Sequence, residues 1–87
     1  MNRDELERRL ATVIEACASR LSPPSGALLR ELNQAGEPGV ALEILCSNLE
    51  EGSIPVPEPT LAEIRVLGTA MGIDPTYWAD LNAGTGA

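Results

Sequence analysis

All seven prolines of this 87-residue chain lie at four places, and three of these places also carry a glycine. They stand at residues 23–24, 36–38, 52–59 and 72–75. Proline lacks the backbone donor that a helix interior needs, and it pushes the preceding residue toward extended conformations. Elements therefore begin or end at each place, and the chain can fold only from short elements joined by tight connections.

Apolar residues recur at helical spacing between these breaks, which predicts an all-α fold. The clearest stripe follows a capping box formed by Asn2 and Glu5. Ser22 precedes a proline as a second N-cap, and Thr60 opens another capping box with Glu63. The first stripe consists of Leu6, Leu10, Val13, Ile14 and Cys17.

We expect four helices and a short fifth in one small bundle. The helices are predicted at about residues 3–20, 23–35, 38–51, 60–71 and 75–81, with residues 53–58 as an extended, proline-rich connector. Ile54 and Val56 alternate with prolines there, so one face of the connector can pack on the core. Residues 1–81 form a single helical domain, and residues 82–87 are expected to be a disordered C-terminal tail.

The core is expected to be aliphatic, because Phe is absent and Tyr77 and Trp78 are the only aromatic residues. Trp78 has the largest apolar side chain and is predicted to anchor the last helix. Cys17 and Cys46 have no metal-binding or redox spacing, so we expect buried free thiols rather than a disulfide. Helical spacing also marks these residues as core rather than contact residues: Leu42, Leu45, Cys46, Leu49, Leu67, Met71 and Trp78.

The helix predicted at 60–71 carries apolar residues on two faces, which indicates a central position in the bundle. Its second face consists of the small residues Ala62, Val66 and Ala70, and that face could instead be a homodimer contact. In the preceding helix, Asn48 lies at the edge of the apolar arc. Its side chain is expected to bond either to the backbone of the following segment or to water.

The net charge of −7 is carried by the later part of the chain, where nine acidic residues from position 31 onward face one basic residue, Arg65. Such a field disfavours nucleic acid and anionic membranes as partners, because both need clustered positive charge. It suits a basic protein partner, although a role in solubility alone explains the charge equally well. Neither a signal peptide nor a membrane-spanning pattern is seen, so we expect a cytoplasmic protein.

An acidic stripe runs along the helix predicted at 38–51, opposite its apolar side. Glu43, Ser47 and Glu50 follow i, i+4, i+7 spacing, and Glu51 lies beside Ser47. Glu37 and Glu58 lie near the two ends of the helix. We expect this stripe to bind the partner; the alternative is a solvated helix face without a role in binding. The six residues of the acidic stripe are Glu43, Ser47, Glu50, Glu51, Glu37 and Glu58.

Catalysis is not expected, because the chain has no His and hence lacks the usual general base and the commonest metal ligand. No phosphate-binding loop, nucleophile elbow or metal-binding loop is present, so no cofactor or metal is expected. An acyl carrier protein shares the size and acidity. Such carriers need an exposed Ser at a helix start, whereas Ser47 lies in mid-helix.

Three motifs resemble the MafI family of immunity proteins, which are small cytosolic antitoxins of bacterial polymorphic toxin systems. They are Ala41-Leu-Glu-Ile-Leu-Cys-Ser-Asn-Leu49, Ile54-Pro-Val-Pro and Leu67-Gly-x-Ala-Met-Gly-Ile-Asp-Pro-x-Tyr-Trp78. The resemblance covers about residues 28–81 and does not extend to residues 1–27. Family members often carry an acidic residue where this chain has Ser47.

The resemblance implies tight binding to a cognate toxin domain, often a nuclease. The charge leads to a compatible expectation, because a nuclease needs positive surface to hold phosphates and an anionic protein can occlude it. Inhibition would then be steric and electrostatic. The rival hypothesis is an acidic homo-oligomeric scaffold or regulatory helical module without a toxin partner.

Overall fold

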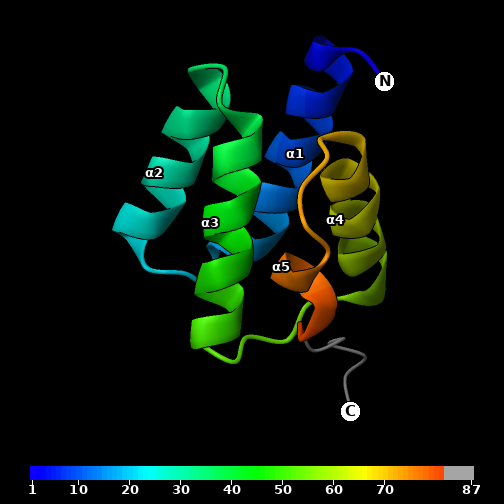
Figure 1. Cartoon of the computed structure of the whole chain (residues 1–87). Coiled ribbons are helices and arrows are strands. Elements are labelled where there is room, and N and C mark those ends of the chain that lie inside the picture. The colour runs from blue at the N-terminus through cyan, green and yellow to red at the C-terminus, as the bar shows by residue number, and fades with distance from the viewer. Residues whose placement is uncertain (82–87) are drawn as a thin grey trace.

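The computed structural model describes residues 1–81 and contains five helices in that range, which confirms the predicted all-α class (Figure 1). The helices are α1 (Arg3–Ala18), α2 (Pro23–Gln34), α3 (Pro38–Glu51), α4 (Glu58–Ala70) and α5 (Thr76–Ala79). No strand occurs between residues 1 and 81. The tail predicted at 82–87 lies outside the described residues.

The first four helices run alternately up and down (Figure 1). Helices α1, α2 and α3 pack against one another, α4 packs on α1 and also contacts α3, and α5 packs against α3. Residues 71–75 lead from the end of α4 back to α5. None of the helices among residues 1–81 is long and apolar enough to cross a membrane.

The predicted N-caps of the first two helices are present, and so is the glycine predicted to end the second. Asn2 Oδ1 accepts a hydrogen bond from the amide of Glu5 at 2.8 Å, and Ser22 Oγ accepts one from the amide of Ser25 at 3.3 Å. Gly36 ends α2 with φ of 84°, a left-handed conformation that costs glycine little. These local features fix the starts of α1 and α2 and the end of α2.

The start of α4 differs from the prediction. The helix begins at Glu58 instead of Thr60, and Pro59 lies in its first turn, where the missing amide donor leaves no bond unmade. The capping box expected at Thr60 is wrong, because the Glu63 carboxylate bonds to Arg9 on α1 instead. At the end of α3, the left-handed residue is Ser53, with φ of 50°.

The core is aliphatic, as predicted, and the expected free thiols Cys17 and Cys46 are both buried in it. Val56 of the proline-rich connector is fully buried, and Ile54 packs partly against the core. Trp78 is buried and joins α5 to the bundle. Among the predicted core residues, Met71 is half-buried. The other six are buried, as predicted: Leu42, Leu45, Cys46, Leu49, Leu67 and Trp78.

The expectation that the fourth helix is central is wrong. One side of α4 packs on the bundle, and its second face is exposed at Ala62, Val66 and Ala70. A homodimer through this face stays a prediction. The side chain of Asn48 makes no hydrogen bond to another residue in the described part of the chain, so its predicted bond to the following backbone is not seen.

Polar contacts join α1 to its neighbours. Arg9 donates two hydrogen bonds to the Glu63 carboxylate, from Nε to Oε2 at 2.6 Å and from Nη2 to Oε1 at 2.7 Å. Buried Asn33 of α2 donates from Nδ2 to the backbone oxygen of Glu7 at 2.9 Å. Arg20 Nη1 donates to the backbone oxygen of Pro55 at 2.6 Å. Helix α1 is thereby tied to α2 and α4, and the turn that follows α1 is tied to the connector.

Candidate functional site

The acidic stripe lies on α3 as predicted, with its two outlying carboxylates at the flanking helix starts. Ser47, Glu50 and Glu51 are exposed, and Glu43 is half-buried. Glu37 immediately precedes α3, and Glu58 opens α4; both are exposed.

The structure separates the stripe into two groups. Glu37 and Glu43 border a groove near the start of α3. Ser47, Glu50 and Glu51 border a shallow depression near its end. The two groups therefore offer different surroundings to a partner, one beside an apolar groove and one on an open helix face.

Helix α3 carries its carboxylates without any basic residue. The four ion pairs among residues 1–81 all join side chains of α1 to residues of α1, α2 or α4. Two carboxylates, Glu50 and Glu51, lie in the last turn of α3, where the carbonyl end of the helix dipole is already negative. This placement disfavours the helix and leaves a concentrated negative charge at its end.

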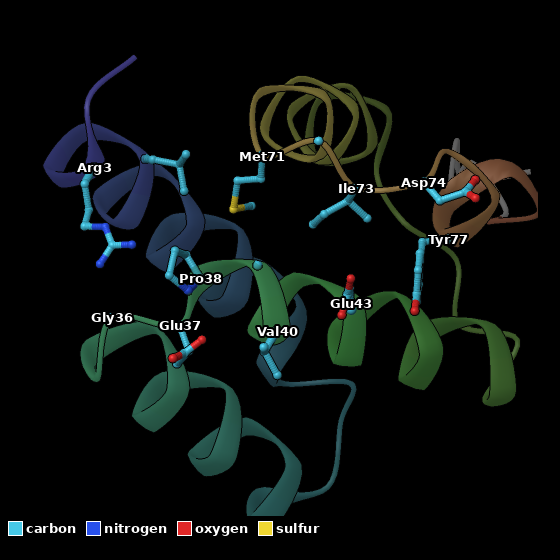
Figure 2. A pocket seen from close by; sticks show the side chains of 13 residues that line it. Arg3, Gly36, Glu37, Pro38, Val40, Glu43, Met71, Ile73, Asp74 and Tyr77 are labelled. Carbon is cyan, nitrogen blue, oxygen red and sulfur yellow. The ribbon is translucent and has the colours of Figure 1, made fainter.

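The groove lies where three parts of the chain meet (Figure 2). The start of α3 forms one wall, the segment after α4 forms the opposite wall, and the first turns of α1 close one end. Its volume is about 640 Å³. The apolar side chains that line it are Leu6, Pro38, Val40, Met71, Ile73 and Tyr77.

Three carboxylates and one guanidinium border this apolar groove. The carboxylates belong to Glu37, Glu43 and Asp74, and the guanidinium belongs to Arg3, whose Nε lies 4.0 Å from Glu7 Oε2. The backbone amide of Thr76 donates to Asp74 Oδ1 at 3.0 Å, and this hydrogen bonding lowers the pKa of Asp74. Asp74 thus stays ionised at neutral pH, and the border of the groove is net negative.

The buried thiols are not suited to nucleophilic chemistry. Burial raises the pKa of Cys17, and it raises that of Cys46 to about 12, so both stay protonated at neutral pH. Within residues 1–81, no group of three or more Cys, Asp or Glu side chains is arranged to hold a metal ion.

The sequence did not single out the groove, because its residues come from segments far apart in the chain. Helical spacing predicts Met71 in the core, yet Met71 is half-buried and lines the groove together with half-buried Tyr77. The sequence feature that could have pointed to the groove is the pair of glycines Gly36 and Gly72. Each adopts a positive φ angle in one of the two turns beside the groove.

Comparisons with known protein families, with curated proteins and with solved structures give no match for this chain. Its function is therefore inferred from its own residues.

Proposed function

We propose that this protein is an immunity protein, which binds a cognate bacterial toxin domain and neutralises it. The expected partner is a basic domain of the nuclease type, and inhibition is by steric and electrostatic occlusion. In this proposal the protein acts in the cytoplasm, catalyses no reaction, needs no cofactor, and binds neither nucleic acid nor membrane.

The observation that carries the proposal is the placement of charge on α3. Carboxylates needed for solubility alone can lie anywhere on a surface. Glu50 and Glu51 instead lie at the helix end where negative charge costs stability, and no basic residue of α3 offsets them. A function that uses this negative face explains the placement better than solubility does.

The geometry of the stripe also fits occlusion of a nuclease. A nuclease domain holds the phosphates of its substrate with Lys and Arg. The exposed carboxylates of α3 can meet such residues across an interface, which speeds association and sets the orientation of the two proteins. The resemblance of residues 28–81 to MafI proteins leads to the same class of partner.

The rival is an acidic scaffold that forms homo-oligomers. One observation favours it: Val66 is 46% exposed and lies between two exposed alanines, Ala62 and Ala70, on the outer face of α4. Small apolar faces of this kind permit close helix contact. Sedimentation equilibrium of the wild type and of Val66→Lys tests the rival, which requires a dimer that the substitution disrupts.

Co-expression with a toxin gene that neighbours the gene for this protein tests the proposal. Rescue of growth, together with a complex that survives purification, supports an immunity function. Growth arrest with each neighbouring toxin, at a level where the protein is soluble and folded, contradicts it. A variant with both Glu50→Lys and Glu51→Lys should fold, because Lys in the last turn complements the helix dipole. It should nevertheless rescue growth poorly.

A further inference from the structure

We propose that the groove between α3 and the segment after α4 receives an extended segment of the protein partner, in which an aromatic or large aliphatic side chain is flanked by Lys or Arg. This inference deepens the proposed function and rests on it only for the identity of the partner. The chemistry of the segment follows from the walls, the border and the position of the groove.

The interior of the groove suits an apolar side chain. Met71 and Tyr77 are half-buried, and Val40 is 40% exposed, so apolar surface remains open to solvent there. Figure 2 shows Met71 and Ile73 on the opposite side of the groove from Val40 and Glu43. Met is unbranched and adapts its shape to what it contacts. An inserted aromatic or aliphatic side chain would cover this surface.

The border of the groove selects basic neighbours for that side chain. Glu43 and Asp74 lie on opposite walls, and Glu37 stands at the start of α3 (Figure 2). Arg3, the one basic residue at the groove, already lies beside Glu7. Lys or Arg on either side of the inserted residue would meet these carboxylates, whereas acidic neighbours would be repelled.

The start of α3 also offers backbone donors to an extended segment. Glu37 provides no side-chain cap, and the first backbone hydrogen bond of the helix is donated by Ala41 to the oxygen of Glu37 at 3.0 Å. The amides of Gly39 and Val40, both at the groove, therefore have no acceptor within residues 1–81. Backbone oxygens of a bound segment can accept from them.

A second copy of this chain is a poor occupant. The chain carries a net charge of −7 and has only six Arg and no Lys. Arg3, Arg9 and Arg30 pair with carboxylates, and Arg20 bonds to the Pro55 backbone. Because Glu43 belongs to both the groove and the acidic stripe, a basic partner docked on the stripe reaches the groove directly.

Defined peptides test the inference without the toxin. The probe is a blocked pentapeptide of sequence Gly-Lys-Phe-Lys-Gly, titrated into the isotopically labelled chain while amide chemical shifts are recorded. Two matched peptides replace Phe by Ser or both Lys by Glu. The Phe peptide should shift the amides of residues 36–43 and 71–77 and bind at least about tenfold more tightly than either control, because the controls lose the apolar contact or the charge attraction.

Two matched variants of the protein sharpen the test. Val40→Lys places a positive charge in the groove and should weaken binding of the Phe peptide at least about tenfold. Val66→Lys makes the same change at a similarly exposed valine on α4, outside the groove, and should leave binding within about twofold. Thermal unfolding checks that both variants remain folded.

Several outcomes would overturn the inference. The first three concern the peptides: no saturable shifts up to roughly 10 mM peptide, equal binding of the Phe and Ser peptides, or shifts located away from the groove. The fourth is a set of groove shifts that depend on protein concentration without any peptide. That result would assign the groove to a second copy of the chain. None of these results bears on rescue from a toxin, so failure of the groove and failure of the immunity function can be told apart.

Discussion

The indole ring of Trp78 lies directly on Gly68, in a place that a side chain at residue 68 would occupy. A Cβ built on Gly68 would stand 2.5 Å from Cη2 of the ring and closer still to Cζ3. Gly68 is in the interior of α4, and Trp78 is the buried residue of α5. This contact fixes the last helix on the bundle and, with it, the segment that forms one wall of the groove.

Gly68→Ala should destabilise the fold, although alanine is the better helix former. Overpacking a core costs about 1–3 kcal/mol, and the severe overlap with the ring places Gly68→Ala in the upper part of that range, about 2–3 kcal/mol. The gain in helix propensity is about 1 kcal/mol, so we expect a net loss of about 1–2 kcal/mol. Gly26→Ala in α2 is the control, because its Cβ would meet Arg30 and Ala18 at 3.5 Å or more. Denaturant unfolding should show the control unchanged or more stable. A Gly68→Ala variant as stable as wild type would mean that the ring does not rest on α4.

Trp78→Ala should remove the anchor of α5 from the core. We expect a loss of about 3–5 kcal/mol, which is a large part of the stability of so small a domain. Far-ultraviolet circular dichroism during heating measures the loss. Ala79, an exposed neighbour in the same short helix, offers a control through Ala79→Ser, which should change little. An unchanged melting temperature for Trp78→Ala would place the indole on the surface and make it an interface candidate.

The Arg9–Glu63 pair should make stability depend on acid pH. Hydrogen bonding from Arg9 lowers the pKa of Glu63 below its ordinary value of 4.5. The unfolded chain therefore takes up this proton at a higher pH than the folded chain. The stabilisation is present above pH 4.5 and is lost as the pH falls through the folded-state pKa.

Free energies of unfolding of the wild type and of Glu63→Gln, measured from neutral to acid pH, test this dependence. The variant should be less stable at neutral pH, and its curve should converge with that of wild type below pH 4.5. Glu15→Gln breaks the comparable ion pair with Arg30. The Glu15 side chain is 58% exposed, against 27% for Glu63. Because the Glu15 pair is more exposed, salt should reduce the effect of Glu15→Gln more than the effect of Glu63→Gln. Parallel curves for wild type and Glu63→Gln across the acid range would contradict the role of this pair.

The parts of the fold that depend on neighbouring residues followed from the sequence. Proline positions and helical spacing located the helices, Asn2 and Ser22 capped two of them as expected, and Val56 packed on the core from an extended segment. These predictions succeeded because caps, breaks and amphipathic stripes act within a few residues of the chain.

The features that failed or were missed depend on residues far apart. Thr60 and Glu63 have the spacing of a capping box, but Arg9, 54 positions away in sequence, takes the Glu63 carboxylate. The contact of Gly68 with Trp78 and the assembly of the groove likewise require the packed helices. One-dimensional spacing carries no information about which distant segment will lie opposite a given face.

The central claim is that the carboxylates of α3 bind a basic partner, and reversing two of them tests it most directly. Glu43→Lys with Glu50→Lys should weaken binding to the cognate toxin at least tenfold, about 1.4 kcal/mol, because like charges would then face each other. Folding should survive, since both side chains lie outside the core. Glu31→Lys with Asp80→Lys changes the net charge equally at exposed sites off the stripe and is the matched control.

The deciding measurement is the affinity and association rate of wild type, the double variant and the control for that toxin at two salt concentrations. The account predicts that the double variant alone loses at least about tenfold at low salt, chiefly in association rate, and that the loss shrinks at high salt as charges are screened over roughly 8–10 Å. Unchanged affinity of the double variant at both salt concentrations, or an equal loss in the control, would contradict it.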